Sequence, residues 1–167
     1  MIRSLAAFEA IWTVEAQGTQ KLLDALTDAS LAQSVAPGLR TIGRLAWHIT
    51  TTVPEMMGLT GLNVEGADAH APVPPSAKVI ADSYRRAAAS LAEQIRAHWT
   101  DASLAQTDAM YGEQWARGLT LQILILHQTH HRGQLTVLMR QAGLKVPGLY
   151  GPAMEEWAAY GAPAPAI

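Results

Sequence analysis

The stretch Leu119–Gly143, which reads LTLQILILHQTHHRGQLTVLMRQAG, decides the fold of this chain. Its apolar residues recur at intervals of three and four, the period of an α-helix that buries one face. Gly143 ends the pattern and is typical of the residue that follows a helix C-terminus. The stretch therefore predicts one long, largely buried helix from about Leu119 to Ala142.

Two histidines on this helix have the spacing of metal ligands. His127 and His131 are four residues apart, so their side chains differ by about 40° around the helix axis and lie one turn apart. Both can bind one cation. His130 is rotated by about 60° from His127, so it either replaces one of the two ligands or lies at the rim of the site.

A third ligand has to come from another helix, and His48 is the best candidate. It lies in the apolar segment Leu45-Ala-Trp-His-Ile49, which we expect to pack against the long helix. An apolar environment disfavours a charged imidazole. The pair His127 and His131 alone fits a metal site and ordinary hydrogen-bonded core histidines equally well. Three inward histidines on two packed helices are more simply explained by one cation.

Other polar residues have narrower roles in this hypothesis. Gln134, one turn beyond His131, can orient its ring by a hydrogen bond. Glu55 shares the face of His48 and is considered as a hydrogen-bond acceptor for a ligand or as a base. His70 and His98 are expected at the surface. Five aromatic residues are expected in the core or the pocket wall: Trp47, Tyr111, Trp115, Tyr150 and Trp157.

The same helical period recurs in three further segments, each preceded by a Ser or Thr that can cap a helix N-terminus. They run from Ser4 to about Leu26, from Thr41 to around Gly58 to Gly61, and from Ser76 to about Trp99. Pro54 predicts a kink or a local loosening of the second helix between His48 and Glu55. Leu62 to Pro75 is a long loop, and a short last helix is expected over 153–160. We find no stretch with the alternation of a half-buried strand, and 101–117 is the least regular part. Four long amphipathic helices predict an all-α four-helix bundle.

The composition of the chain indicates how many domains it forms and which partners it can have. The 167 residues suit a single domain over 1–167. Apolar residues make up 49% and charged residues 16% of the chain, so we expect a partner subunit, most simply in a homodimer, to cover part of the surface. The net charge of -2 and scattered basic residues argue against nucleic acid as a partner.

The chain contains no cysteine, which excludes disulfides, thiolate ligands and a cysteine nucleophile. Histidine is left as its main metal-binding side chain. The N-terminal segment lacks a secretory h-region, and no apolar run is long enough to span a membrane. We therefore expect a soluble cytoplasmic protein with no membrane partner.

The motifs together resemble the DinB/YfiT-like superfamily of metal-dependent four-helix-bundle proteins. The resemblance is carried, in order, by Leu45-Ala-Trp-His-Ile49, by the His127 segment ending in His-His-Arg-Gly-Gln134, and by Gly143-x-x-x-Pro-Gly-x-Tyr-Gly151. It covers essentially the whole chain, and its most specific part is His-His-Arg-Gly-Gln. The resemblance implies an up-down-down-up bundle, usually homodimeric. It also implies a divalent ion, nickel or zinc first, held by His48, His127 and His131.

Characterised members of that superfamily include thiol S-transferases that use bacillithiol or mycothiol, a mycothiol-dependent isomerase, and bundle domains of thiol-histidine synthases. Three neutral ligands leave coordination positions open, as in a catalytic site. A bound water would give a hydrolase, and a bound low-molecular-weight thiol would give a transferase acting on a small-molecule substrate. The alternative is a non-catalytic metal-binding or dimerisation module, in which the cation ties two helices together.

Overall fold

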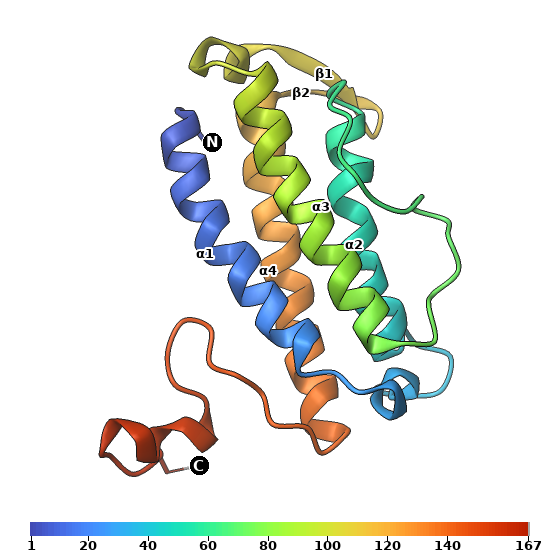
Figure 1. Ribbon diagram of the computed structural model, residues 1–167, viewed down its shortest axis with the longest axis vertical. Helices are drawn as coiled ribbons and strands as arrows, with labels where there is room; N and C mark the ends of the chain where they lie inside the picture. Colours follow the sequence, from blue (N-terminus) through green and yellow to red (C-terminus); the bar gives the residue numbers. More distant parts are fainter. Residues whose placement is uncertain (167) are drawn as a thin grey trace.

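In the computed structural model, which describes residues 1–166, four α-helices lie side by side in one bundle (Figure 1). The helices are α1 (Leu5–Asp24), α2 (Ile42–Gly58), α3 (Ala77–His98) and α4 (Arg117–Gln141). α1 packs against α3 and α4, and α2 packs against the same two helices. Every helix therefore buries one side in a common core.

The connections set the direction of each helix. α1 and α4 run downward in Figure 1, while α2 and α3 both run upward. A long crossing segment returns the chain from the end of α2 to the start of α3. This is the up-down-down-up order, so the expected all-α bundle is confirmed.

Local sequence fixes where the helices begin. The hydroxyl oxygen of Ser4 accepts a hydrogen bond from the Ala7 amide, and that of Thr41 accepts one from the Arg44 amide. Both expected caps are therefore present. Ser76 also precedes α3, but its side chain makes no capping hydrogen bond.

Pro54 does not interrupt α2, which continues to Gly58. The crossing segment approaches the proline ring closely at Gly66. A Cβ atom on Gly66 would lie 2.5 Å from Cγ of Pro54, far inside van der Waals contact. The path of this connection along the bundle therefore requires glycine at position 66.

A β-hairpin between α3 and α4 was not expected from the sequence. After the short 3-10 helix η2 (Asp101–Ala105), β1 (Thr107–Met110) pairs antiparallel with β2 (Glu113–Ala116). Tyr111 and Gly112 form the turn, with φ angles of 52° and 90°. Two consecutive residues with positive φ are the signature of a type I′ hairpin turn. The expectation of no strands was wrong here.

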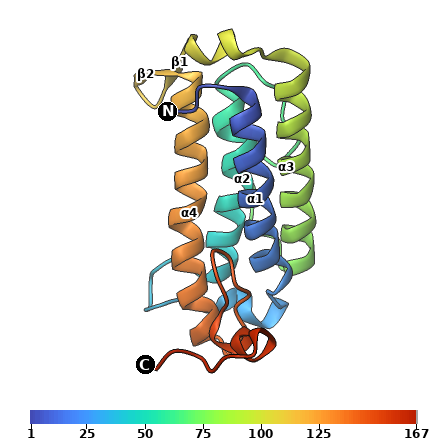
Figure 2. The ribbon, with the colours of Figure 1, turned by 90° about the vertical axis from the view of Figure 1, so that its left-hand side faces the viewer.

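Two further short helices complete the described chain. η1 (Asp28–Ala32) lies in the connection from α1 to α2, and η3 (Met154–Tyr160) lies where a short last helix was expected. The C-terminal segment folds beside the end of the bundle at which α4 ends (Figure 2). Within residues 1–166, no helix is long and apolar enough to cross a membrane.

Candidate metal centre

The structure brings the three expected ligands together. His48 lies near the middle of α2, and His127 and His131 lie near the middle of α4, which packs against α2. One ligand nitrogen from each ring lies within 4.8 Å of the other two. The ring centroids are 4.4–5.0 Å apart.

The spacing of the nitrogens fits a cation. Nε2 of His127 and Nε2 of His131 are 3.1 Å apart. Adjacent nitrogens bound to one ion at about 2.0–2.1 Å are separated by roughly 3.0–3.4 Å. A hydrogen bond between these two rings would have the same length, but it would not explain why His48 also lies beside them. The residues present fit a divalent ion better than they fit an isolated histidine pair.

Gln134 makes the expected hydrogen bond to one candidate ligand. Nδ1 of His131 donates a hydrogen bond to Oε1 of Gln134 over 2.8 Å. With the proton on Nδ1, the lone pair of Nε2 faces the other two histidines. The amide nitrogen of Gln134 in turn donates to Nε2 of His130 over 3.1 Å. This arrangement makes Gln134 the link between the cluster and the rim.

Burial keeps the cluster neutral. Desolvation is the largest cause that lowers the pKa of His48 to about 4, and the neighbouring His127 and His131 add to it. Desolvation also lowers the pKa of His127 to about 4, and that of His131 in the same direction. Neutral imidazoles offer the lone pairs that a metal needs.

His130 and Glu55 do not join the cluster. His130 is exposed and lies at the rim, one of the two positions that the sequence left open. The carboxylate of Glu55 instead accepts a hydrogen bond from the hydroxyl of Tyr111 over 2.7 Å. Glu55 therefore makes no hydrogen bond to a candidate ligand. His70 and His98 are exposed, as expected.

The aromatic residues follow the sequence prediction only in part. Trp47 is buried, and Trp115 and Trp157 are partly buried. Tyr111 and Tyr150 are 57% and 68% exposed, and neither lines the pocket beside the cluster, so their expected place in the core or the pocket wall was wrong. Each uses its hydroxyl in a polar contact, Tyr111 with Glu55 and Tyr150 with Glu15.

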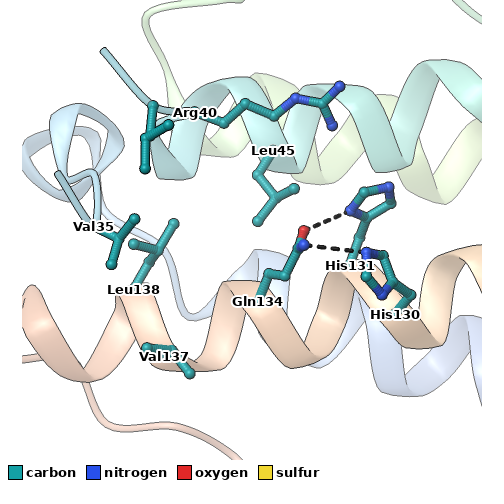
Figure 3. A pocket seen from close by; sticks show the side chains of 9 residues that line it. Val35, Arg40, Leu45, His130, His131, Gln134, Val137 and Leu138 are labelled. Carbon is teal, nitrogen blue, oxygen red and sulfur yellow. Dashed lines mark hydrogen bonds between the residues drawn. The ribbon is translucent and has the colours of Figure 1, made fainter. Parts of the chain in front are cut away.

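A pocket of about 550 Å³ opens beside the cluster (Figure 3). His131, Gln134 and His130 form its polar side. The rest of the wall comes from the segment before α2, from α2 itself and from the last turns of α4: Val35, Leu39, Arg40, Leu45, Val137 and Leu138. Its volume lies in the range of small-molecule sites. The loop residues that line it carry no motif, and sequence analysis did not identify them.

Arg132 has a structural place that the sequence did not reveal. Its side chain is 2% exposed and pairs with the carboxylate of Glu15 on α1. Beside it, the buried amide oxygen of Gln128 accepts hydrogen bonds from the hydroxyls of Tyr84, over 2.7 Å, and Thr19, over 3.1 Å. This network joins α1, α3 and α4 on the side of α4 that faces α1.

These features define a class of protein: a four-helix bundle with a candidate tri-histidine metal centre at the edge of a pocket. The model of the DinB family matches residues 1–165. The chain belongs to the DinB family.

Individual relatives agree. YrdA of Bacillus subtilis (strain 168) is 46% identical over 165 residues, which is 99% of each chain. A DinB-like protein from Bacillus cereus ATCC 10987, known from a crystal structure, is 49% identical with a TM-score of 0.87, covering 90% of this chain and 100% of that one. YjoA of Bacillus subtilis shares the fold at a TM-score of 0.68 and 19% identity, covering 89% of this chain and 99% of that one.

Proposed function

We propose that this protein is a metal-dependent enzyme that transfers a low-molecular-weight thiol onto an electrophilic small molecule. The observation that carries the proposal is the convergence of His48, His127 and His131 beside a pocket whose wall includes His131. Nickel and zinc are the first candidates for the ion because both accept three imidazole nitrogens. A bound divalent ion would lower the pKa of a thiol or water and so supply a nucleophile at neutral pH.

The number of protein ligands favours a catalytic metal site over a structural one. Structural zinc sites are normally closed by four protein ligands, whereas catalytic sites leave one position to water or substrate. Within residues 1–166, the grouping around these histidines contains no fourth His, Asp or Glu. A non-catalytic module would need such a ligand to close the site.

The side chains around the pocket favour a thiol over water as the nucleophile. Attack by water calls for a general base. Among the described residues no Asp or Glu lines the pocket, and Nε2 of His130 already accepts a hydrogen bond from Gln134. A thiol, with a free pKa near 8.5, needs far less help to ionise than water does. The chain contains no cysteine, so the thiol comes from a second small molecule. Gln134 orients His131 and also donates a hydrogen bond to His130 at the rim.

Thiol transfer is tested with nickel-loaded or zinc-loaded protein. Bacillithiol, mycothiol and glutathione are each offered with monochlorobimane or a chloronitrobenzene, and product is followed by fluorescence or absorbance. In the expected reaction the sulfur forms a bond to carbon, chloride leaves, and the thiol proton is released. We expect at least one thiol to give a rate that falls about 100-fold or more in His131→Ala, since loss of a metal ligand should remove the ion that activates the thiol.

Two results would replace the proposal. Metal-dependent cleavage of an ester or amide, with no thiol-dependent rate above that of His131→Ala, would establish the hydrolase. The absence of both activities across broad panels, with metal still bound, would favour the non-catalytic module.

We also propose that the protein forms a homodimer through the first half of α4. Between Arg117 and Arg132 this helix carries no charged residue, and Leu126 on it is 51% exposed. Such a face is costly to leave in water and is typical of a subunit interface. In a C2 dimer both subunits contribute the same surface patch to the interface, so one substitution changes the interface on both sides.

The dimer is tested by Leu126→Glu, which would place two carboxylates in the proposed interface. We expect the mass measured by light scattering to fall from that of two chains to that of one. Val79→Glu is the matched control, because Val79 on α3 is 49% exposed and lies outside the proposed face. A wild-type monomer, or a dimer unaffected by Leu126→Glu, would contradict the proposed interface.

A further inference from the structure

We propose that the pocket beside the histidine cluster binds a small carboxylate with an apolar body, and that Arg40 recognises the carboxylate. This inference deepens the proposed function, since it names the class of substrate that the same site takes. It rests on three features of the pocket. The guanidinium of Arg40 has no ion-pair partner among the described residues, part of the pocket wall is apolar, and one loop carries both Arg40 and apolar side chains.

Arg40 is the only charged residue among the described residues that line the pocket. It lies in the segment just before α2, and its guanidinium is directed along α2 toward the side of the pocket that holds His131 (Figure 3). Arg40 and the candidate ligand His131 line the same pocket. A cation in this position attracts an anion toward the cluster.

The guanidinium has no ion-pair partner within residues 1–166. Six other arginines are paired: Arg85 with Asp24 and Asp82, Arg86 with Glu65, Arg96 with Glu9, Arg117 with Asp108, Arg132 with Glu15 and Arg140 with Glu155. Among the described residues Arg3 and Arg44 also lack an ion-pair partner, but neither lines the pocket. A planar guanidinium can donate two parallel hydrogen bonds to a carboxylate. Arg40 is therefore available for a ligand.

Five of the other residues that line the pocket are apolar. Leu45 and Leu138 are buried at its base, whereas Val35, Leu39 and Val137 are 54–56% exposed around its mouth. An apolar ligand body of a few carbon atoms would cover these side chains and gain roughly 0.8 kcal/mol for each buried CH2 group. A ligand that carried charge at both ends would lose this contact.

One anchored loop supplies both kinds of contact. The bridge between Ser34 and Thr41, together with the hydrogen bond from the Ile42 amide to the Gln33 carbonyl over 2.8 Å, closes the loop at its base. Val35, Leu39 and Arg40 lie between these anchors. A carboxylate held by Arg40 would thus have its apolar part against the loop and against α4.

The proposal is tested by calorimetric titration of hexanoate, hexanamide and acetate into the protein, both nickel-loaded and metal-free. We expect wild-type protein to bind hexanoate at least tenfold more tightly than either of the other two, in both forms. Arg40→Gln should reduce hexanoate to the level of hexanamide and leave hexanamide unchanged. Leu39→Ser should reduce hexanoate toward acetate. Arg44→Gln, one helical turn along α2 and outside the pocket lining, should change hexanoate binding less than twofold.

The metal-free arm separates this proposal from the proposed function. If hexanoate binds only to nickel-loaded protein and Arg40→Gln has no effect, the carboxylate is held by the ion and the role of Arg40 is overturned. If no nickel binds but metal-free protein shows the Arg40-dependent preference, the metal-dependent function fails while the carboxylate site stands. Tighter, Arg40-dependent binding of hexyl phosphate would assign a phosphate instead.

A second copy of the chain is the competing occupant of the apolar wall. Light scattering on Leu39→Ser distinguishes the two. An unchanged mass with weakened hexanoate binding supports the ligand site. A loss of dimer mass, with unchanged hexanoate affinity, would show that these side chains form an interface and would overturn the proposal.

Discussion

Replacing His131 by alanine is expected to lower the nickel or zinc content of the protein from about one ion per chain to near zero. The substitution removes one of three nitrogens that converge within 4.8 Å and leaves two ligands. Because loss of a supporting residue alone costs about 10- to 100-fold in metal affinity, loss of a ligand should cost more. Tag-free protein is incubated with the metal, dialysed and analysed for elemental content. His127→Ala and His48→Ala should behave alike.

Two control variants separate the loss of a ligand from other effects of substitution. His70→Ala removes an exposed histidine and should leave one ion bound. Gln134→Leu removes the hydrogen bond to Nδ1 of His131 and should weaken binding by about 10- to 100-fold. Circular dichroism should show the same helix content in every variant. Wild-type protein holding less than about a tenth of an ion, or equal loss in His70→Ala, would refute the site.

The four helices were predictable because the apolar period of each helix extends over many residues. The period of three to four recurs through Leu119–Ala142, and Ser4 and Thr41 mark two helix starts with side chains that do cap them. The distance between His127 and His131 along one helix fixes their shared direction. His48 could be placed with them only because its apolar neighbours predicted packing of α2 against α4.

The missed features depend on few residues or on contacts distant in sequence. The β-hairpin turn uses Tyr111 at positive φ, where Asn, Asp or Gly would have signalled the turn. The pocket joins Arg40 to residues of α4 that are about ninety positions away, and no periodicity encodes such a contact. In the sequence Arg132 is only one residue of the His-His-Arg-Gly-Gln motif. In the structure its side chain is 2% exposed because it pairs with Glu15 on α1, a contact that the motif does not reveal.

That buried ion pair leads to the largest expected change in stability. Arg132→Met leaves the carboxylate of Glu15, whose side chain is 13% exposed, without its guanidinium. The hydrogen bonds from Arg132 to the Glu15 carbonyl, over 2.7 Å, and to the Thr129 hydroxyl, over 3.0 Å, are lost as well. Removing one member of a buried pair typically costs about 3–5 kcal/mol, because the other charge stays buried and unpaired. Urea unfolding of metal-free protein measures this change.

The double variant Arg132→Met/Glu15→Met identifies the cause of the loss. If the cost arises from an unpaired charge, removing the second charge should recover about 1–4 kcal/mol relative to Arg132→Met. Arg96→Met breaks an ion pair with Glu9 whose side chains are 59% and 37% exposed, and should cost less than about 1 kcal/mol. An Arg132→Met variant no less stable than Arg96→Met would show that the pair contributes little. The pair would then account for the position of Tyr150, which contacts both of its members, and not for the stability of the bundle.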